Sequence, residues 1–96
     1  MQDPDLEFAD NPARNRYEAR LGRRVVGWSE YEPGDRRITF VHTAVTRSFE
    51  GRGIGGRLVA WALEDLRRRG LGIAVECPFV ASYLRRHPEY DDLVDR

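Results

Sequence analysis

The stretch Glu50-Gly51-Arg52-Gly53-Ile54-Gly55-Gly56-Arg57 decides how this chain folds, because it separates alternating strand-like sequence from helical sequence. From Ile54 to Leu66 apolar residues recur every four positions, which predicts an amphipathic helix over residues 53–69. The first N–H groups of a helix have no intrahelical acceptor, and glycines let an anion approach them closely. The stretch therefore predicts an anion-binding turn at a helix N-terminus.

Before this turn, short alternating segments separated by turn residues predict an antiparallel meander. Residues 16–21, 24–32 and 37–45 are the expected strands, and residues 6–10 form at best a short edge strand. The last hairpin turn is Glu32-Pro33-Gly34-Asp35. The meander should thus contain three to four strands.

After the helix, Gly70 is a stop signal, and the apolar residues 71–76 predict a buried strand. Pro78 suits the first position of a second helix that extends to about His87 and ends before Pro88. A right-handed crossover makes the strand at 71–76 parallel to the one at 37–45. We therefore expect an α+β fold, a meander followed by an α-β-α unit, in one domain over residues 1–96 with a disordered tail at 1–5.

Composition restricts the function classes. Of the 96 residues, 41% are hydrophobic and 33% are charged, with a net charge of zero, which indicates a soluble globular domain without a nucleic-acid or membrane partner. All sixteen basic residues are Arg, so no Schiff-base or Walker lysine exists. Cys77 is the only cysteine, which excludes an internal disulfide and a zinc site built on several cysteines and favours a cytoplasmic location. No metal site is expected. The acidic N-terminus does not resemble a secretory signal.

The glycine turn alone leaves alternatives open. A Walker A motif fails because Arg57 and Leu58 follow the last glycine. A dinucleotide fingerprint, Gly51-x-Gly53-x-x-Gly56, is matched in spacing, although mostly polar residues separate it from the preceding strand. A nucleotide-binding interaction domain and a flexible turn therefore stay possible at this point.

The segment Glu50-Gly51-Arg52-Gly53-Ile54-Gly55 resembles the Q/R-x-x-G-x-G/A signature of the GNAT N-acetyltransferase superfamily, with Glu50 at the position of the usual Gln or Arg. The chain is most similar to the minimal YjdJ-like branch. That likeness is carried by His42-Thr43-x-Val45, by Cys77-Pro78-Phe79-Val80 and by His87-Pro88-Glu89-Tyr90. Together these segments extend the resemblance over roughly residues 16–94, which is most of the chain.

The resemblance implies an N-acetyltransferase that uses acetyl-CoA and an amine acceptor of unknown identity, either a small molecule or a protein. It implies that the cofactor lies where the two parallel strands diverge. The strand backbone at Val45 would pair with the pantetheine amides, and Arg57 or Arg52 would supplement the phosphate contacts. The pyrophosphate would lie on the loop residues Gly51, Arg52, Gly53, Ile54, Gly55 and Gly56.

Two residues are candidates for the chemistry. His42 is expected to share a strand face with Ile38 and Phe40, and its neutral imidazole could deprotonate the acceptor. Cys77 lies between a strand and a helix N-terminus, which favours a thiolate and makes it a candidate nucleophile. Direct attack of the amine on acetyl-CoA is favoured over a ping-pong route through Cys77, because GNAT-like sites generally use it.

The general acid is not evident, because the position of the tyrosine in larger relatives falls on Arg85, two residues after Tyr83. The helical segment that covers the acceptor site in larger relatives is missing. A non-catalytic acyl-CoA-binding module is therefore the alternative function. The large aromatic residues Trp28, Trp61 and Phe79 are expected in the core.

Overall fold

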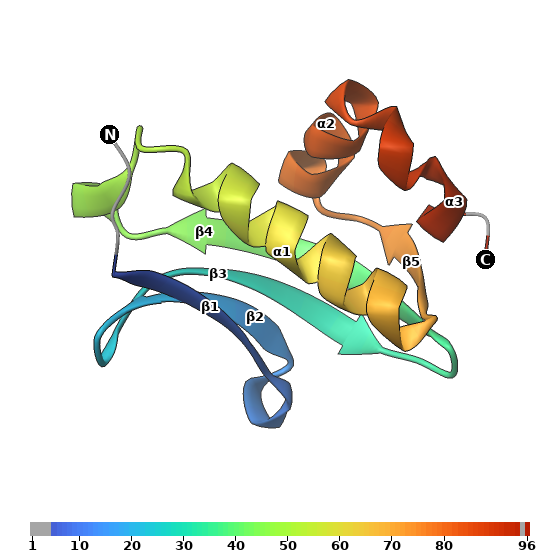
Figure 1. The fold of residues 1–96 in the computed structure, drawn as a ribbon, viewed down its shortest axis with the longest axis horizontal. Helices are drawn as coiled ribbons and strands as arrows, with labels where there is room; N and C mark the ends of the chain where they lie inside the picture. The colour runs from blue at the N-terminus through green and yellow to red at the C-terminus, as the bar shows by residue number, and fades with distance from the viewer. Residues whose placement is uncertain (1–4, 95) are drawn as a thin grey trace.

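A computed structural model describes residues 5–94 and 96 (Figure 1). The expected disordered tail falls on residues 1–4, which lie outside the described residues, and on Asp5, which lies in an exposed turn. Among the described helices, none is long and apolar enough to cross a membrane. No group of three potential metal-ligating side chains occurs within this part of the chain.

Five strands form one sheet in the order β1-β2-β3-β4-β5. The first four are antiparallel, and β4 and β5 are parallel, so the predicted α+β architecture is confirmed. The strands are β1 (Leu6–Asn11), β2 (Arg16–Leu21), β3 (Arg24–Pro33), β4 (Arg37–Val45) and β5 (Gly72–Val75). The predicted short edge strand is therefore present, and each of the other predicted strand and helix boundaries either matches the observed one or differs from it by one residue.

The main helix, α1 (Ile54–Arg69), connects the two parallel strands and packs against the sheet (Figure 1). Its apolar stripe, which includes the fully buried Leu58, Leu63 and Leu66, faces the core. Gly70 ends the helix with a left-handed φ of 72°, as the glycine stop predicts. Helix α2 (Pro78–Arg86) then follows β5 directly.

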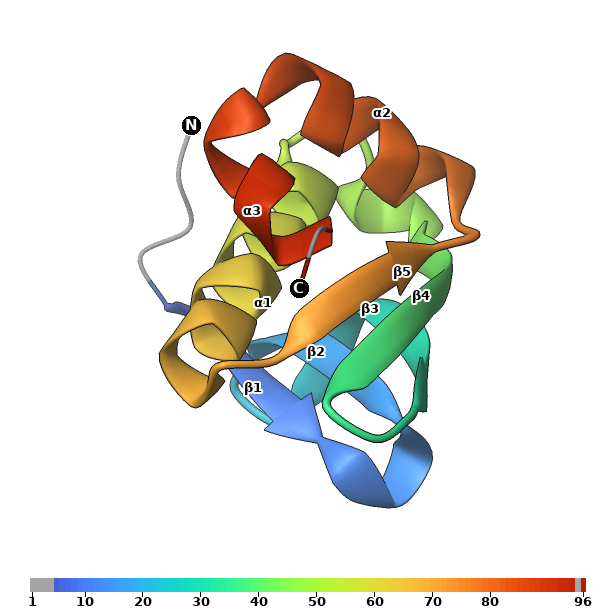
Figure 2. The same cartoon turned by 90° about the vertical axis from the view of Figure 1, so that its right-hand side faces the viewer.

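The chain is helical from Pro88 to Val94, which the sequence did not lead us to expect. A 3₁₀ turn at Pro88–Tyr90 leads into the one-turn helix α3 (Asp91–Val94). Leu93 is fully buried, and the Tyr90 hydroxyl donates a 2.9 Å hydrogen bond to Glu64 of α1. These contacts attach the C-terminal segment to α1 on the same side of the sheet (Figure 2).

The opposite face of the sheet is covered by none of the described helices (Figure 2). Polar side chains of β2 cover it instead. Glu18 is only 2% exposed because Arg16 and Arg20 form ion pairs with its carboxylate. The candidate site lies at the C-terminal end of β4, next to the start of α1.

Candidate functional site

The parallel strands diverge halfway along β4. Their pairing ends at Phe40 and Val75, and the Phe40 carbonyl then accepts bonds from the N–H groups of both Glu76 (2.9 Å) and Cys77 (3.1 Å). Beyond Phe40, β4 continues to Val45, and none of the described strands pairs with it on this edge. The divergence that the resemblance implied is therefore present.

The open edge exposes the backbone of alternate residues. The Thr46 N–H donates to the carbonyl of Val26 in β3 at 2.9 Å, so Thr46 and Val26 form a hydrogen-bonded pair of the ladder. Because hydrogen-bonded and non-hydrogen-bonded pairs alternate in an antiparallel ladder, Ala44 also bonds to β3. Thr43 and Val45 therefore turn their N–H and C=O groups toward the open edge, where an extended amide-containing ligand can pair with them.

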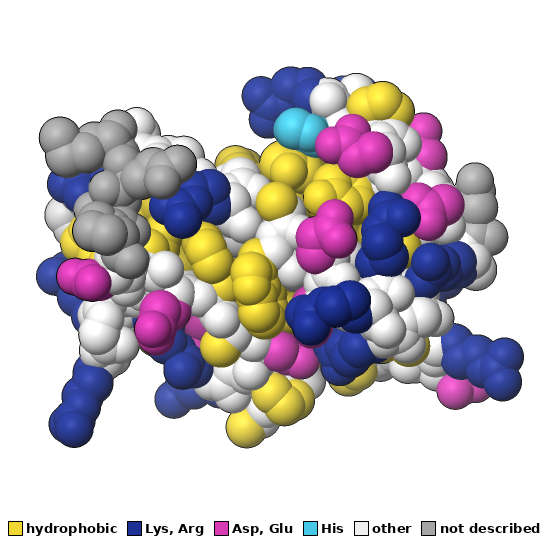
Figure 3. All heavy atoms as spheres, in the orientation of Figure 1, with side chains coloured by type: hydrophobic (Ala, Val, Ile, Leu, Met, Phe, Trp, Pro, Cys, Tyr) yellow, Lys and Arg dark blue, Asp and Glu magenta, His cyan; other side chains and the backbone are white. Residues whose placement is uncertain are grey.

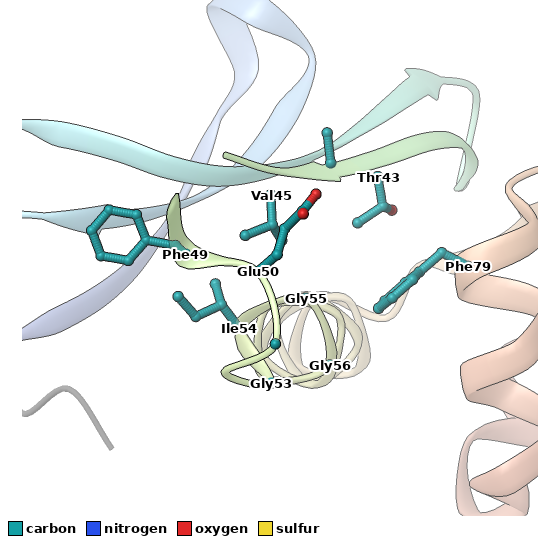
Figure 4. A pocket seen from close by; sticks show the side chains of 11 residues that line it. Thr43, Val45, Phe49, Glu50, Gly53, Ile54, Gly55, Gly56 and Phe79 are labelled. Atoms are coloured by element: carbon teal, nitrogen blue, oxygen red, sulfur yellow. The ribbon is translucent and has the colours of Figure 1, made fainter. Parts of the chain in front are cut away.

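A pocket of about 480 Å³ lies between this edge and the start of α1 (Figure 4). Its walls come from four segments: Thr43–Val45 of β4, residues 49–51 of the loop, Gly53–Gly56 of α1 and its N-cap, and Phe79 of α2. Phe49 and Phe79 lie on opposite sides of the pocket (Figure 4). The pocket thus joins the open strand edge and the glycine turn in one cavity.

The glycine turn presents unpaired donors to this cavity. The first helical hydrogen bond of α1 runs from the Arg57 N–H to the Gly53 carbonyl, 3.1 Å. The N–H groups of residues 54–56 consequently precede any intrahelical acceptor. Gly51 and Gly53 have φ values of 81° and 75°, which non-glycine residues rarely adopt, so both glycines are needed for the turn. This geometry suits an anion at the positive end of a 16-residue helix.

Cys77 lies at the inner end of the site. It is the N-cap residue of α2 and is 2% exposed. Its Sγ is 3.4 Å from the Thr43 Oγ1, and Thr43 Oγ1 is 2.9 Å from the Oγ of the buried Ser29. Thr43 therefore stands between the thiol and the pocket, a position that the sequence analysis did not assign to it.

The expected placement of His42 on the face of Phe40 is wrong. Phe40 pairs with Tyr31, but His42 pairs with Glu30, so Val41 is an extra residue in β4. Such a bulge moves every following side chain to the other face. His42 is consequently exposed and is not part of the pocket wall. It lies beside the divergence point, on the uncovered face of the sheet.

The two arginines of the stretch Glu50–Arg57, Arg52 and Arg57, lie apart from each other. The Arg57 guanidinium is 5.5 Å from the ring centroid of Phe8 and lines a separate pocket with Phe8 and Trp61, away from the glycine turn. Hydrophobic side chains are visible on this outer surface over α1 (Figure 3). The Arg52 guanidinium, by contrast, is 5.0 Å from the ring centroid of Phe49, which lines the main pocket. Neither arginine lines the main pocket, but Arg52 lies on an aromatic ring that does.

The expectation that Phe79 lies in the core is wrong, because Phe79 is 41% exposed and lines the pocket. Trp61 is partly buried against the core.

On the same helix as Phe79, Tyr83 is buried and stacks on His87 with ring centroids 4.0 Å apart, whereas Arg85 is exposed. Burial, followed by the nearby Glu89 carboxylate, raises the pKa of Tyr83. Tyr83 therefore remains a neutral phenol. It lies near α1, with its Cε1 atom 3.9 Å from a Cβ atom built on Gly56.

Comparisons with known proteins agree with this architecture. A sequence model of the GCN5-related N-acetyltransferase family matches residues 16–93. A Staphylococcus aureus protein described as GCN5-like superposes with a TM-score of 0.70 at 24% identity, over 95% of this chain and 89% of that one. A Bacillus subtilis acetyltransferase in complex with CoA superposes with a TM-score of 0.53 at 19% identity, over 73% of this chain and 62% of that one. No curated protein sequence matches the chain.

Proposed function

The chain belongs to the GCN5-related N-acetyltransferase family, and on this premise we propose that it transfers the acetyl group of acetyl-CoA to an amine. One observation carries the proposal: a single pocket contains both an unpaired strand edge and the unpaired amides of a helix N-terminus. The first fits an extended chain of amides and the second fits a diphosphate. The Bacillus subtilis protein of similar fold, crystallised with CoA, supports the same ligand.

Each part of the site has a role in this proposal. The N–H groups of residues 54–56 bind the diphosphate, and the backbone groups of Thr43 and Val45 pair with the pantetheine amides. The thioester supplies an activated acetyl group and would lie near Thr43, at the Cys77 end of the pocket. Arg57 has no part, because it lies over Phe8.

The acceptor amine is proposed to approach from the uncovered face of the sheet. His42 lies on that face where β4 and β5 have parted, and we propose that it accepts the proton of the attacking amine. Cys77 is buried behind Thr43, which favours direct attack of the amine over prior acetylation of the thiol. The uncovered face of the sheet leaves room for a large acceptor. We further propose that the chain is a member of the YjdJ-like branch.

Titration and turnover together test the proposal. We expect calorimetry to show acetyl-CoA binding, and amide NMR signals of residues 43, 45 and 54–56 to shift on titration. We expect thiol release from acetyl-CoA to accelerate with at least one member of a panel of amines and peptides. Binding without acceleration across the panel would support the non-catalytic module instead, and tight binding of ATP or NAD without CoA binding would remove both readings.

A further inference from the structure

Phe49 lies at the side of the pocket away from Phe79 (Figure 4). Two arginines from distant parts of the sequence, Arg24 and Arg52, converge on its ring. The Arg24 guanidinium lies over the Phe49 ring at 5.2 Å from its centroid, and the Arg52 guanidinium lies over the same ring at 5.0 Å. Arg24 begins β3, and Arg52 belongs to the glycine turn. One aromatic ring therefore holds two cations at the edge of the pocket.

This arrangement brings like charges together in a chain of zero net charge. Arg24 is exposed and forms no ion pair with any of the described carboxylates. Glu50 lines the same pocket, but its carboxylate is turned toward β4 (Figure 4). Stacking on Phe49 keeps both planar guanidinium groups in defined positions, so less freedom is lost when they bind an anion.

The direction of the proposed ligand identifies that anion. If the thioester lies at the Cys77 end and the diphosphate lies on residues 54–56, the nucleoside end of CoA must leave the pocket on the remaining side, past Phe49. CoA carries a phosphomonoester on its ribose 3′ oxygen, a dianionic group well suited to arginine forks. We infer that Arg24 and Arg52, held by Phe49, form a subsite for this 3′-phosphate and make the protein selective for CoA over 3′-dephospho-CoA.

This inference rests on the proposed function, and a comparison of two ligands separates the two. Calorimetry should give a dissociation constant about tenfold lower for CoA than for 3′-dephospho-CoA with the wild-type protein, the effect of one charge-assisted contact. Arg24→Gln should abolish most of this difference by weakening CoA alone. Arg24→Lys, which keeps the charge but not the fork, should lie between them.

Arg23→Gln is the matched control, because Arg23 is an exposed neighbour on the same turn that does not stack on Phe49. It should leave both dissociation constants unchanged. Equal binding of CoA and 3′-dephospho-CoA by the wild type would overturn the subsite while leaving the proposed function intact. Equal losses of CoA affinity in the Arg23 and Arg24 variants would also overturn the subsite, because the loss would then follow from removing any positive charge in this region. Failure of both ligands to bind would reject the proposed function itself.

Discussion

A Cβ atom built on Gly55 lies 2.7 Å from the Cζ atom of Phe79, so the Phe79 ring rests directly on the first turn of α1. Gly55 has no unusual φ, and its role differs from that of Gly51 and Gly53, which are needed for the turn itself. Gly55 is instead required for a close approach between α1 and α2. This contact sets the position of one wall of the proposed cofactor pocket.

Replacing Gly55 and Gly56 with alanine should therefore have different effects on stability. At Gly56 the nearest atom to a new Cβ is Tyr83 Cε1 at 3.9 Å, an ordinary contact. Gly56→Ala should raise the free energy of unfolding by about 0.5–1 kcal/mol, the helix-propensity gain. Gly55→Ala should lose most of that gain because Phe79 has to move. Urea denaturation of both variants measures the difference.

The Phe79 side chain supplies the control. In a Phe79→Ala background the obstacle is absent, so Gly55→Ala should then stabilise the protein about as much as Gly56→Ala does. A Gly55→Ala change that is equally stabilising with and without Phe79 would show that the ring does not rest on Gly55.

Acid sensitivity should depend on Glu18. Burial by itself would raise the pKa of this carboxyl, but hydrogen bonds from Arg16, Arg20 and Asn11 outweigh it and lower the pKa from 4.5 to about 2. A depressed pKa stabilises the fold above pH 4.5, and this contribution is lost as the pH falls from about 4.5 to 2. The loss should be roughly 1–3 kcal/mol, because Arg20 is itself partly exposed.

Urea denaturation at a series of pH values between 7 and 2 checks this. Glu18→Gln should be less stable than the wild type at pH 7, and its stability should fall less between pH 4.5 and 2. Glu32→Gln, at an exposed position of β3, should keep the wild-type slope. Parallel curves for the wild type and Glu18→Gln would contradict the assignment.

The sequence predicted the features that depend on local pattern, and it failed where tertiary contacts decide. Periodicity and glycine stops located α1, β4 and the parallel strand within a residue or two. The bulge at Val41 has no local signal, because an uninterrupted alternation through His42 also fits the sequence. The convergence of Arg24 on Phe49 joins positions 25 residues apart and requires the folded loop. The short helix α3 depends on burying Leu93, which no periodic segment announces.

Turnover should distinguish the roles predicted for His42 and Cys77. His42→Gln should lower kcat about 100-fold or more, the usual effect of removing a general base, whereas His87→Gln, which changes the other histidine, should not. Cys77→Ala should retain most of the activity if the amine attacks directly. Mass spectrometry of the wild type incubated with acetyl-CoA alone should then show no acetylated Cys77. An acetyl group on Cys77 that disappears when the acceptor is added would establish the ping-pong route.

Proline substitutions can test the open edge of β4, because neighbouring residues direct their N–H groups to opposite sides. The Ala44 N–H faces β3, so Ala44→Pro should remove a ladder bond and strongly destabilise the sheet. The Val45 N–H faces the open edge, so Val45→Pro should leave the β3 ladder intact and unfold at nearly the wild-type temperature. The same Val45→Pro variant should bind acetyl-CoA about tenfold more weakly in calorimetry, because one donor to the pantetheine is gone. Wild-type affinity in a folded Val45→Pro protein would mean that the ligand does not pair with this strand, and it would move the cofactor away from the edge on which the proposed mechanism depends.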